Sequence, residues 1–419
     1  MSDNSKTLFN VAAALVLLAT AAGAQTIATG DSRSVSQPSF PGVCETLTAQ
    51  FTTSQRSSPP SSDDTSRLQA ALTSCAGTGK SVVLASSGSY NAFYSGKITV
   101  NGEGLVVNSG VTLYGNSSYS SQSELVYVEG SNSFIGGPGT IDGRGDIISG
   151  TPRLVQTSSA DNFIIYDVTL TQAAHPNLYI QGGSGATVYD VTILTPASRA
   201  NADGIDIDSI ANVSVINSTI NAGDDGIAVK TNESAASNIT VKNTKLYGTH
   251  GLSIGSQTMY GVTNVLFTGN YVYGDDKMSG AASTDANAIN IKTDYDCGGT
   301  VKQVTYLNTC ITEAKHLIVL NTAYGSCSGN TGIPVFSDIV INGVKSTSSV
   351  SGAYSEIHGY SSSYLINAYV ANIDLDSNTQ SSDQDATLYL DNVNSWSPSG
   401  TDVTDDSFTL SGSVPSCSF

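Results

Sequence analysis

The sequence is poor in several residue types, and each shortage narrows the possible fold. Only 12% of its 419 residues are charged, and it contains 3 Met and 1 Trp. Leu, Ala, Glu and Lys rarely fall at helical spacing, whereas Ser, Thr, Asn, Val, Ile and Gly are abundant. Such a composition favours short strands joined by tight turns. We therefore expect an all-β protein.

Basic charge is also scarce. The chain has 17 Lys and Arg against 35 Asp and Glu, which gives a formal net charge of −18. An acidic surface repels nucleic acid, so we exclude DNA and RNA as partners. No stretch after residue 24 reaches 18 consecutive apolar residues, so we expect no membrane-spanning helix.

The first residues have the pattern of a secretory signal peptide, which we assign to residues 1–24. Lys6 precedes an apolar run over residues 11–22, and small residues at 22–24 form a cleavage signal. We therefore predict a secreted, extracellular protein. No Pro/Gly/Ser-rich linker divides the rest of the chain, so residues 25–419 are expected to form one domain.

Cysteine is present in the even number that favours disulfides in a secreted protein. Six cysteines allow fifteen pairings, and we predict the three that follow sequence order: Cys44–Cys75, Cys297–Cys310 and Cys327–Cys417. No spacing of Cys or His indicates a zinc site. Five sequons permit N-glycosylation if the source is eukaryotic: Asn116, Asn212, Asn217, Asn232 and Asn238.

A short pattern recurs along the chain: alternating apolar residues, a central Asp or Asn, and a second apolar run. The central residue falls at positions 167, 190, 217, 243 and 270, so successive copies lie 23, 27, 26 and 27 residues apart. This period fits one rung of a solenoid built from short strands. The consensus of leucine-rich repeats and the recurring Trp of propellers are missing. We therefore predict a right-handed parallel β-helix.

Three segments depart from the repeat. Residues 60–79 have the only convincing amphipathic helical pattern, and we expect this N-terminal helix to cap the open end of the solenoid. Residues 25–60, which precede and enter it, are expected to be extended or loop-like. Residues 274–287 break the period and are predicted to form a loop beside the working face.

Four polar segments interrupt the repeat, and each carries a residue typical of an active site. These residues, with Tyr324 as a fifth candidate, are Asp203, Asp225, His250 and Lys292, at intervals of 22, 25, 42 and 32 residues. Equivalent residues on adjacent rungs lie about 4.8 Å apart on one face. We therefore predict a vertical strip of three Asp, one His and one Lys, which supplies the carboxylates that glycosidic cleavage requires.

The strip contains two adjacent carboxylates. On a flat strand, Asp224 and Asp225 would point to opposite faces. Gly223 and Gly226 flank them, and we expect a bend or bulge that turns both carboxylates into the cleft. Crowded carboxylates raise one another's pKa, which allows one to stay protonated as the acid.

These segments resemble the signatures of the polygalacturonase family, glycoside hydrolase family 28. The family carries Asn-Thr-Asp, Gly-Asp-Asp, Gly-His-Gly and Arg-Ile-Lys. The chain has, in the same order, Asn201-Ala202-Asp203, Gly223-Asp224-Asp225, Thr249-His250-Gly251 and Asn290-Ile291-Lys292. The resemblance covers most of the chain from about residue 40, and the ordered set is far more specific than any one triplet.

The resemblance implies inverting hydrolysis of α-1,4-linked galacturonan, the polymer of pectin, without a metal or organic cofactor. It implies that Asp224 is the general acid and that Asp203 and Asp225 hold the attacking water. His250 is expected to tune the acid or orient the sugar, and Lys292 to bind a galacturonate carboxylate.

Further substrate contacts are expected at Asn201, Asn290 and Tyr324, and Lys230 is expected to add positive charge at the rim. The polymer substrate, polygalacturonate, is the principal partner that the resemblance implies. Plant polygalacturonase-inhibiting proteins are a second candidate, and we expect the protein to be a monomer.

One departure from the family concerns substrate binding. The family's Arg, which grips a substrate carboxylate, is Asn290 here, and Asn lacks the bidentate fork of Arg. Three interpretations therefore stay open: a polygalacturonate hydrolase, a hydrolase of xylogalacturonan or rhamnogalacturonan, and an inactive secreted pectin-binding protein. A pectate lyase would need calcium-binding carboxylates and a facing Arg, and no Arg lies on the predicted strip.

Overall fold

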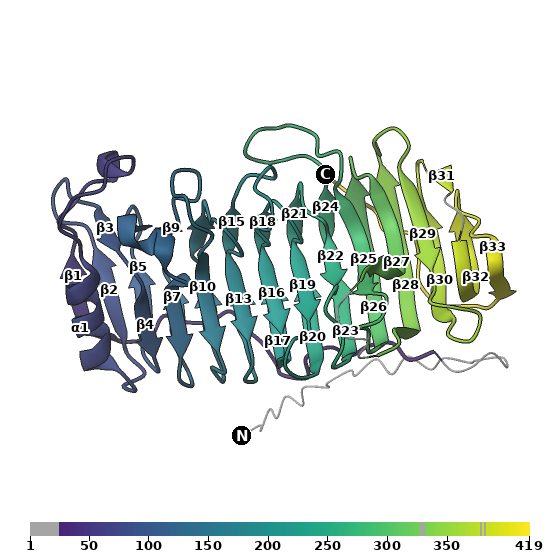
Figure 1. Cartoon of the computed structure of the whole chain (residues 1–419), viewed down its shortest axis with the longest axis horizontal. Helices are drawn as coiled ribbons and strands as arrows, with labels where there is room; N and C mark the ends of the chain where they lie inside the picture. The colour runs from purple at the N-terminus through teal and green to yellow at the C-terminus, as the bar shows by residue number, and fades with distance from the viewer. Residues whose placement is uncertain (1–24, 327–331, 378, 381–382) are drawn as a thin grey trace, which may run out of the picture.

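Each turn of the chain contributes short strands that pair in parallel with those of the next turn, so the strands stack into a long right-handed β-helix (Figure 1). The structure is a computed structural model that describes residues 25–326, 332–377, 379–380 and 383–419. The predicted signal peptide lies outside these residues. The fold prediction is confirmed: the described chain is a single parallel β-helix with one α-helix.

Three strand columns form the faces of the solenoid. The first, which we call face A, contains β4 (Ile98–Asn101), β7 (Glu124–Glu129), β10 (Arg153–Ser158), β13 (Leu178–Gln181), β16 (Ile205–Asp208), β19 (Ile227–Lys230), β22 (Leu252–Ile254), β25 (Asn287–Asp294), β27 (His316–Gly325), β29 (Tyr354–His358) and β31 (Thr379–Gln380).

Face B follows face A along each turn. It contains β1 (Val43–Thr48), β2 (Ser81–Ala85), β5 (Gly104–Val107), β8 (Phe134–Gly136), β11 (Ile164–Tyr166), β14 (Thr187–Tyr189), β17 (Ala211–Ile216), β20 (Ala236–Lys242) and β23 (Val262–Thr268).

Face C completes the turn with β3 (Ala92–Ser95), β6 (Thr112–Gly115), β9 (Thr140–Asp142), β12 (Thr169–Thr171), β15 (Thr192–Leu194), β18 (Thr219–Asn221), β21 (Lys245–Tyr247) and β24 (Tyr271–Tyr273). Toward the C-terminus, faces B and C merge into long strands, namely β26 (Thr300–Thr312), β28 (Val335–Thr347), β30 (Ile366–Asp374), β32 (Asp383–Asn394) and β33 (Gly400–Ser407).

The recurring Asp or Asn of the repeat has a structural cause. In the first four copies this residue adopts positive φ, between 51° and 53°, at the bend between faces B and C. Asn and Asp tolerate this left-handed conformation better than other residues with a side chain. In the fifth copy the bend lies at Gly269, with φ 66°, and not at Asn270. The repeat therefore marks the corner of each rung.

The interior is a continuous apolar core. Strand alternation sends Ile205 and Ile207 inward, where both are fully buried, and leaves Asp206 and Asp208 on the outer side of face A. Neighbouring rungs repeat this pattern, so apolar side chains stack along the axis. Burial of this stack supplies the main stabilisation of the fold.

The N-terminal end is covered by α1 (Thr65–Cys75), which is shorter than the predicted helix over residues 60–79 (Figure 1). Leu68, Leu72 and Cys75 are fully buried and join the solenoid core. Gly77 follows the helix with φ 67°, a conformation that ends a helix readily. Two short 3-10 helices are η1 (Thr53–Gln55) and η2 (Ser117–Ser121).

Residues before β1 run in extended form along the outside of the solenoid. Ala28 donates its backbone N–H to Thr305, Arg33 donates to the carbonyl oxygen of Gly185, and Phe40 packs on the Tyr166 ring. The expectation of extended structure is therefore confirmed for the start of this segment. The contacts run from a late rung to an early one, so the segment ties many rungs together.

The disulfides correct part of the sequence prediction. Cys44–Cys75 is present and joins β1 to α1, as predicted. Cys310 bonds to Cys417, so the predicted pairs Cys297–Cys310 and Cys327–Cys417 are wrong; Cys327 itself lies outside the described residues. The C-terminal tail folds back along the solenoid and brings Cys417 beside β26, an approach that sequence order does not reveal (Figure 1).

The predicted loop over residues 274–287 leaves the solenoid between β24 and β25. Asp276 anchors it because one carboxylate oxygen accepts, at 3.4 Å, the backbone N–H of Ala197, which lies three rungs away. The backbone N–H of Lys277 donates to Asn221. Within the described residues, no helix has the length and apolar character needed to cross a membrane.

Candidate active site

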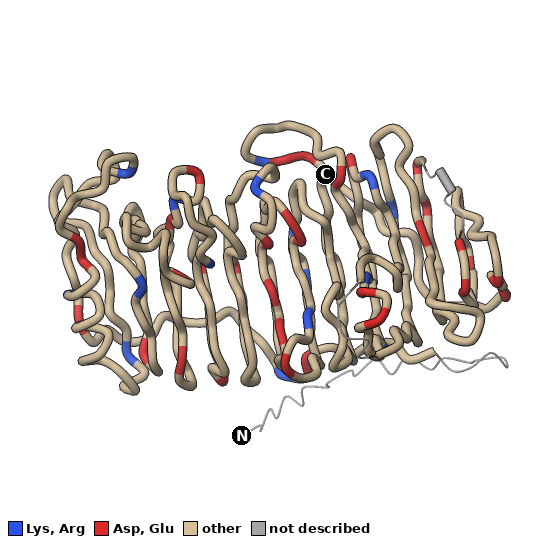
Figure 2. Tube along the Cα trace, in the orientation of Figure 1, with Lys and Arg blue, Asp and Glu red and all other residues tan. Residues whose placement is uncertain are grey.

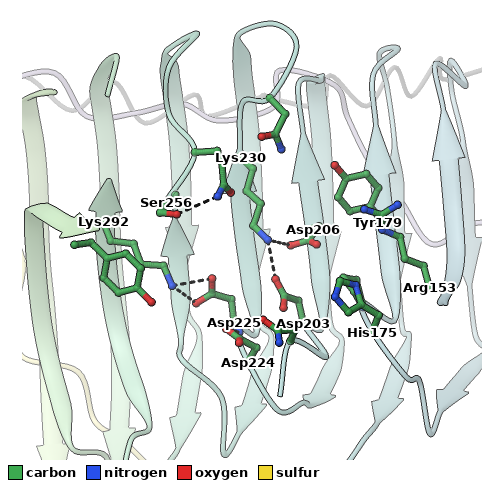
Figure 3. A pocket seen from close by; sticks show the side chains of 16 residues that line it. Arg153, His175, Tyr179, Asp203, Asp206, Asp224, Asp225, Lys230, Ser256 and Lys292 are labelled. Carbon is green, nitrogen blue, oxygen red and sulfur yellow. Dashed lines mark hydrogen bonds and ion pairs between the residues drawn. The ribbon is translucent and has the colours of Figure 1, made fainter. Parts of the chain in front are cut away.

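The outer side of face A is hollowed into a cleft with a volume of about 380 Å³ (Figure 3). Its lining extends from Arg153 on β10 to Tyr324 on β27, with a group of carboxylates between them. Polar side chains dominate this lining. The cleft is therefore suited to a hydrated polar ligand that lies along the solenoid axis.

Three predicted residues lie in one vertical column. Ile205, Ile227 and Leu252 are paired across β16, β19 and β22. The residues two positions earlier on each rung are Asp203, Asp225 and His250. The rung spacing therefore brings together residues that are distant in sequence, as predicted.

Lys292 and Tyr324 do not belong to this column. Ile291 pairs with Ile254, and Ile254 pairs with Val229, so Lys292 is in register with Lys230 two rungs away. Tyr324 lies three residues beyond Asn321, the partner of Lys292. The predicted strip is therefore wrong in register for Lys292, because the 42-residue interval before it includes a loop and a different offset along the strand, whereas Tyr324 lines the cleft as predicted.

The two glycines beside the paired carboxylates are required by close packing. A Cβ on Gly223 would lie 2.0 Å from the carbonyl oxygen of Arg199, and one on Gly226 would lie 2.0 Å from a methyl carbon of Leu246. Neither glycine has positive φ. The backbone at 223–226 is thus held tightly against neighbouring rungs, and both carboxylates line the cleft, as predicted.

Asp225 is held by a cation from two rungs away (Figure 3). Its side chain is 4% exposed, and the Lys292 ammonium lies 3.0 Å from both of its oxygens. Ser253 donates its hydroxyl to the same carboxylate at 2.7 Å. Burial raises the pKa of Asp225, although the Lys292 charge opposes this effect. Asp225 is therefore an ionised carboxylate of raised basicity.

Asp224 is the more exposed of the adjacent pair, with 26% of its side chain accessible. Its Oδ1 lies 3.0 Å from Nδ1 of His250. Burial alone would raise the pKa of Asp224, but the hydrogen bond and charge of His250 lower it to about 2. The same hydrogen bond raises the pKa of His250. The two groups therefore share one proton as an ion pair in the free site.

Asp203 belongs to a cluster with Lys230 and Asp206, and the sequence analysis did not select Asp206. The Lys230 ammonium lies 2.8 Å from Asp203 and 2.8 Å from Asp206. Burial and the nearby Asp203 raise the pKa of Asp206 well above its usual value. Burial alone would lower the pKa of Lys230, but the surrounding carboxylates have the larger effect. The pKa of Lys230 therefore lies well above its usual value, and the lysine stays charged.

The remaining predicted contacts divide into two groups. Asn201, Lys230 and Tyr324 line the cleft, and Tyr324 lies with its ring centroid 4.9 Å from the Lys292 ammonium. Asn290 does not reach the lining: it is 2% exposed, and its amide nitrogen donates to Ser253 at 3.2 Å. Asn290 therefore lies beneath the lining in this conformation, and its direct contact with substrate stays a prediction.

Four functional candidates were missed by the sequence analysis. Arg153, His175 and Tyr179 line the cleft on the N-terminal side of the carboxylates, and Asp206 lies on its floor (Figure 3). Asp206 could have been predicted from the sequence. It lies between Ile205 and Ile207, which face the core, so strand alternation places its side chain on the outer side near Asp203. The others lie on rungs without a recognisable motif.

Asp224, Asp225 and His250 also offer ligand atoms within 4.8 Å of one another, a spacing that suits a metal ion. The Lys292 ammonium already faces both oxygens of Asp225. A cation bound there would meet this positive charge and would have to displace the hydrogen bond between Asp224 and His250. The donor set is therefore better satisfied by the side chains present than by a metal.

The sequons differ in accessibility. Asn116 is 4% exposed, and its amide nitrogen donates to Asp63, so a glycan has no access there. Asn232 lines the cleft and donates to Asp208 at 2.7 Å. Asn212, Asn217 and Asn238 are exposed or partly exposed on face B or at its corner with face C.

Comparison with known proteins gives a consistent result. The family model described as glycosyl hydrolases family 28 matches residues 75–395. An endo-polygalacturonase of Pectobacterium parmentieri is 32% identical over 406 residues, which cover 87% of this chain and 92% of the relative. An endo-polygalacturonase of Pectobacterium carotovorum subsp. carotovorum is 33% identical over 358 residues, covering 75% of this chain and 83% of the relative.

The fold has a solved counterpart. The polygalacturonase from Erwinia carotovora ssp. carotovora superposes with a TM-score of 0.70 and 29% sequence identity. The match covers 90% of this chain and 100% of the solved chain. The similarity therefore spans the solenoid as a whole and includes the rungs that form the cleft.

Proposed function

The chain belongs to glycosyl hydrolases family 28 and is a polygalacturonase-like glycoside hydrolase of pectin, and from this premise we propose how its cleft cleaves the polymer. The observation that carries the mechanism is the arrangement of Asp203, Asp224 and Asp225 on two adjacent rungs of one cleft. Glycosidic hydrolysis needs one group to protonate the leaving oxygen and another to activate water.

Asp224 is the proposed general acid. It is the more accessible of the adjacent carboxylates and shares a proton with His250. In the free site the low pKa of Asp224 leaves that proton mainly on the imidazole. A bound polyanion adds negative charge and displaces water, and both effects raise the pKa of a nearby carboxyl. The proton can then pass through Asp224 to the departing sugar oxygen.

Asp203 and Asp225 are proposed to hold and deprotonate the attacking water. Asp203 is ion-paired with Lys230, which it shares with Asp206, and Asp225 is ion-paired with Lys292. Burial raises the pKa of Asp225, which makes it a better base than an exposed aspartate. With attack from the face opposite the leaving group, the product would have inverted anomeric configuration.

Substrate choice is the second part of the proposal. We propose that the main substrate is de-esterified galacturonan, because two relatives of 32% and 33% identity are endo-polygalacturonases and the cleft offers Arg153 to a substrate carboxylate. Asn290 favours one alternative, a pectin that is decorated or less charged at the position where the family places Arg, since an amide cannot form the bidentate ion pair. Internal cleavage is proposed because the cleft extends to both sides of the carboxylates.

Two measurements test this proposal. Reducing ends released from polygalacturonate, methyl-esterified pectin, xylogalacturonan and rhamnogalacturonan would rank the substrates, and we expect polygalacturonate to be cleaved fastest. Proton NMR of the first product should show the β-anomer from the α-linked polymer. Release from none of these polymers would overturn the enzymatic proposal, and an initial α-anomer would overturn the inverting mechanism.

The cellular setting is also a proposal. The N-terminal signal pattern supports secretion, and the acidic composition suits an extracellular protein. We propose a monomer, to be tested by light scattering. Plant polygalacturonase-inhibiting proteins are proposed as partners that would occlude the cleft; a binding assay with and without bound oligogalacturonide would show competition if this is correct.

A further inference from the structure

The cations that line the cleft are not equally available to a ligand. Lys230 is paired with two carboxylates, and Lys292 is paired with Asp225. Arg153 lines the same cleft, yet within the described residues it forms no ion pair with a carboxylate. Its positive charge is therefore the one that an incoming anion can neutralise without displacing an existing partner.

The guanidinium of Arg153 also has unused hydrogen-bonding capacity. One terminal nitrogen donates to Gln156 at 3.0 Å, while the buried Nε has no partner among the described residues. Arg has five N–H donors in a planar fork that matches a carboxylate. The buried Nε is shielded from the cleft, but the terminal nitrogens form only the bond to Gln156 among the described residues, so the fork keeps donors available for a ligand.

Arg153 is held in place by an aromatic platform. Its guanidinium carbon lies 4.2 Å from the centroid of the Tyr179 ring. The Tyr179 hydroxyl is bonded to Asp208, which is fully buried and also accepts two hydrogen bonds from Asn232. The platform is thus fixed before any ligand arrives, which limits the entropy lost on binding.

The position of Arg153 along the axis fits a polymer. It starts β10, two rungs before the rung of Asp203 and three before that of Asp225. At about 4.8 Å per rung, these separations are about 10 Å and 14 Å. A linked pyranose unit advances by a similar length to one rung. Arg153 therefore lies two to three sugars away from the proposed cleavage point, with His175 between (Figure 3).

The distribution of charge along the solenoid also favours binding of a polyanion at the N-terminal side of the cleft, where Arg153 lies. After His316 the chain carries a single Lys, Lys345, and ten carboxylates: Asp338, Glu356, Asp374, Asp376, Asp383, Asp385, Asp391, Asp402, Asp405 and Asp406. Figure 2 shows acidic residues gathered on the C-terminal strands β29, β32 and β33. A polyanion is repelled from that end and is better stabilised toward β10.

We propose that Arg153, stacked on Tyr179, forms a distal subsite for the free carboxylate of a galacturonosyl residue on the N-terminal side of the cleavage point. This inference rests on the proposed function. Under this proposal a substrate carboxylate is bound by Arg153, on the side of the cleavage point opposite to Asn290. A methyl-esterified sugar is therefore tolerated near Asn290 and disfavoured at Arg153.

The test compares Arg153→Gln, Arg153→Lys and the exposed face B control Lys302→Gln on polygalacturonate. We expect Arg153→Gln to raise KM by about tenfold or more, as for a lost hydrogen bond to a charged group, with little change in kcat. Arg153→Lys should recover part of the loss. Lys302→Gln removes the same charge elsewhere and should leave KM unchanged.

Two further measurements are needed. The first distinguishes carboxylate binding by Arg153 from a purely structural role, and the second tests the subsite independently of the proposed catalytic function. Methyl esterification of the polymer should raise KM for the wild type more than for Arg153→Gln. Calorimetric binding of oligogalacturonate to the inactive Asp224→Asn protein, with and without Arg153→Gln, detects the subsite without catalysis. Unchanged KM and binding in Arg153→Gln would overturn the inference; absent hydrolysis with Arg153-dependent binding would overturn only the function.

Discussion

The pair formed by Asp224 and His250 makes a quantitative prediction about stability. Lowering the pKa of Asp224 from 3.8 to about 2 corresponds to about 2 kcal/mol, since a tenfold change in a binding constant is worth about 1.4 kcal/mol. The side chain is 26% exposed, so solvent screening makes this value an upper limit. Replacing His250 with Gln should therefore cost up to this amount at mildly acidic pH.

The sign of the pH dependence follows from the direction of each pKa. The lowered pKa of Asp224 stabilises the fold above pH 3.8, and this contribution is lost as the pH falls through about 2. The raised pKa of His250 stabilises the fold below pH 6.5, and this contribution is lost as the pH rises through the folded value. The difference between wild type and His250→Gln should be largest between about pH 4 and 6.5.

Denaturant unfolding across this pH range provides the assay. Trp396 is the only Trp and is 4% exposed, so its fluorescence reports the folded state. Asp224→Asn serves as the matched variant, and adding it to His250→Gln should cause little further loss because the interaction is already absent. A stability difference that stays constant from pH 2.5 to pH 8 would refute this account of the pair.

Three further predictions address other parts of the structure. Lys292→Met leaves Asp225 buried without its cation, so kcat should fall by about a hundredfold or more with a higher pKa on the acidic limb of the pH–rate profile; an unchanged profile would refute this role. Asn290→Ala removes the amide that orients the Ser253 hydroxyl, and should lower kcat by about tenfold while KM stays constant in steady-state assays; a change confined to KM would indicate substrate contact instead. Cys417→Ser opens a disulfide that spans 107 residues, so the free energy of unfolding should fall by about 2 to 5 kcal/mol in denaturant titrations, with normal activity at low temperature.

The fold could be predicted because its cause is local and repeated. The corner of each rung needs a residue that accepts positive φ, and this need appears directly as Asp167, Asp190, Asn217 and Asn243. The same spacing placed Asp203, Asp225 and His250 in one column, since no long loop separates these rungs.

The predictions that were wrong depend on long-range geometry. The register of Lys292 includes the loop over residues 274–287, whose length hides the offset along the strand. The partner of Cys310 is set by a tail that returns along the solenoid. Arg153 belongs to no motif, and its proposed role follows only from the pairing of the other cleft cations.

The roles of the paired carboxylates are the central claim, and one comparison tests them most directly. Initial rates of reducing-end release from polygalacturonate should be measured for the wild type, Asp224→Asn and the exposed control Asp405→Asn. We predict that the kcat of Asp224→Asn is lower than that of the wild type by a factor between about one hundred and ten thousand. The control should keep full activity, and both variants should stay folded. Equal rates for Asp224→Asn and the wild type would contradict the account.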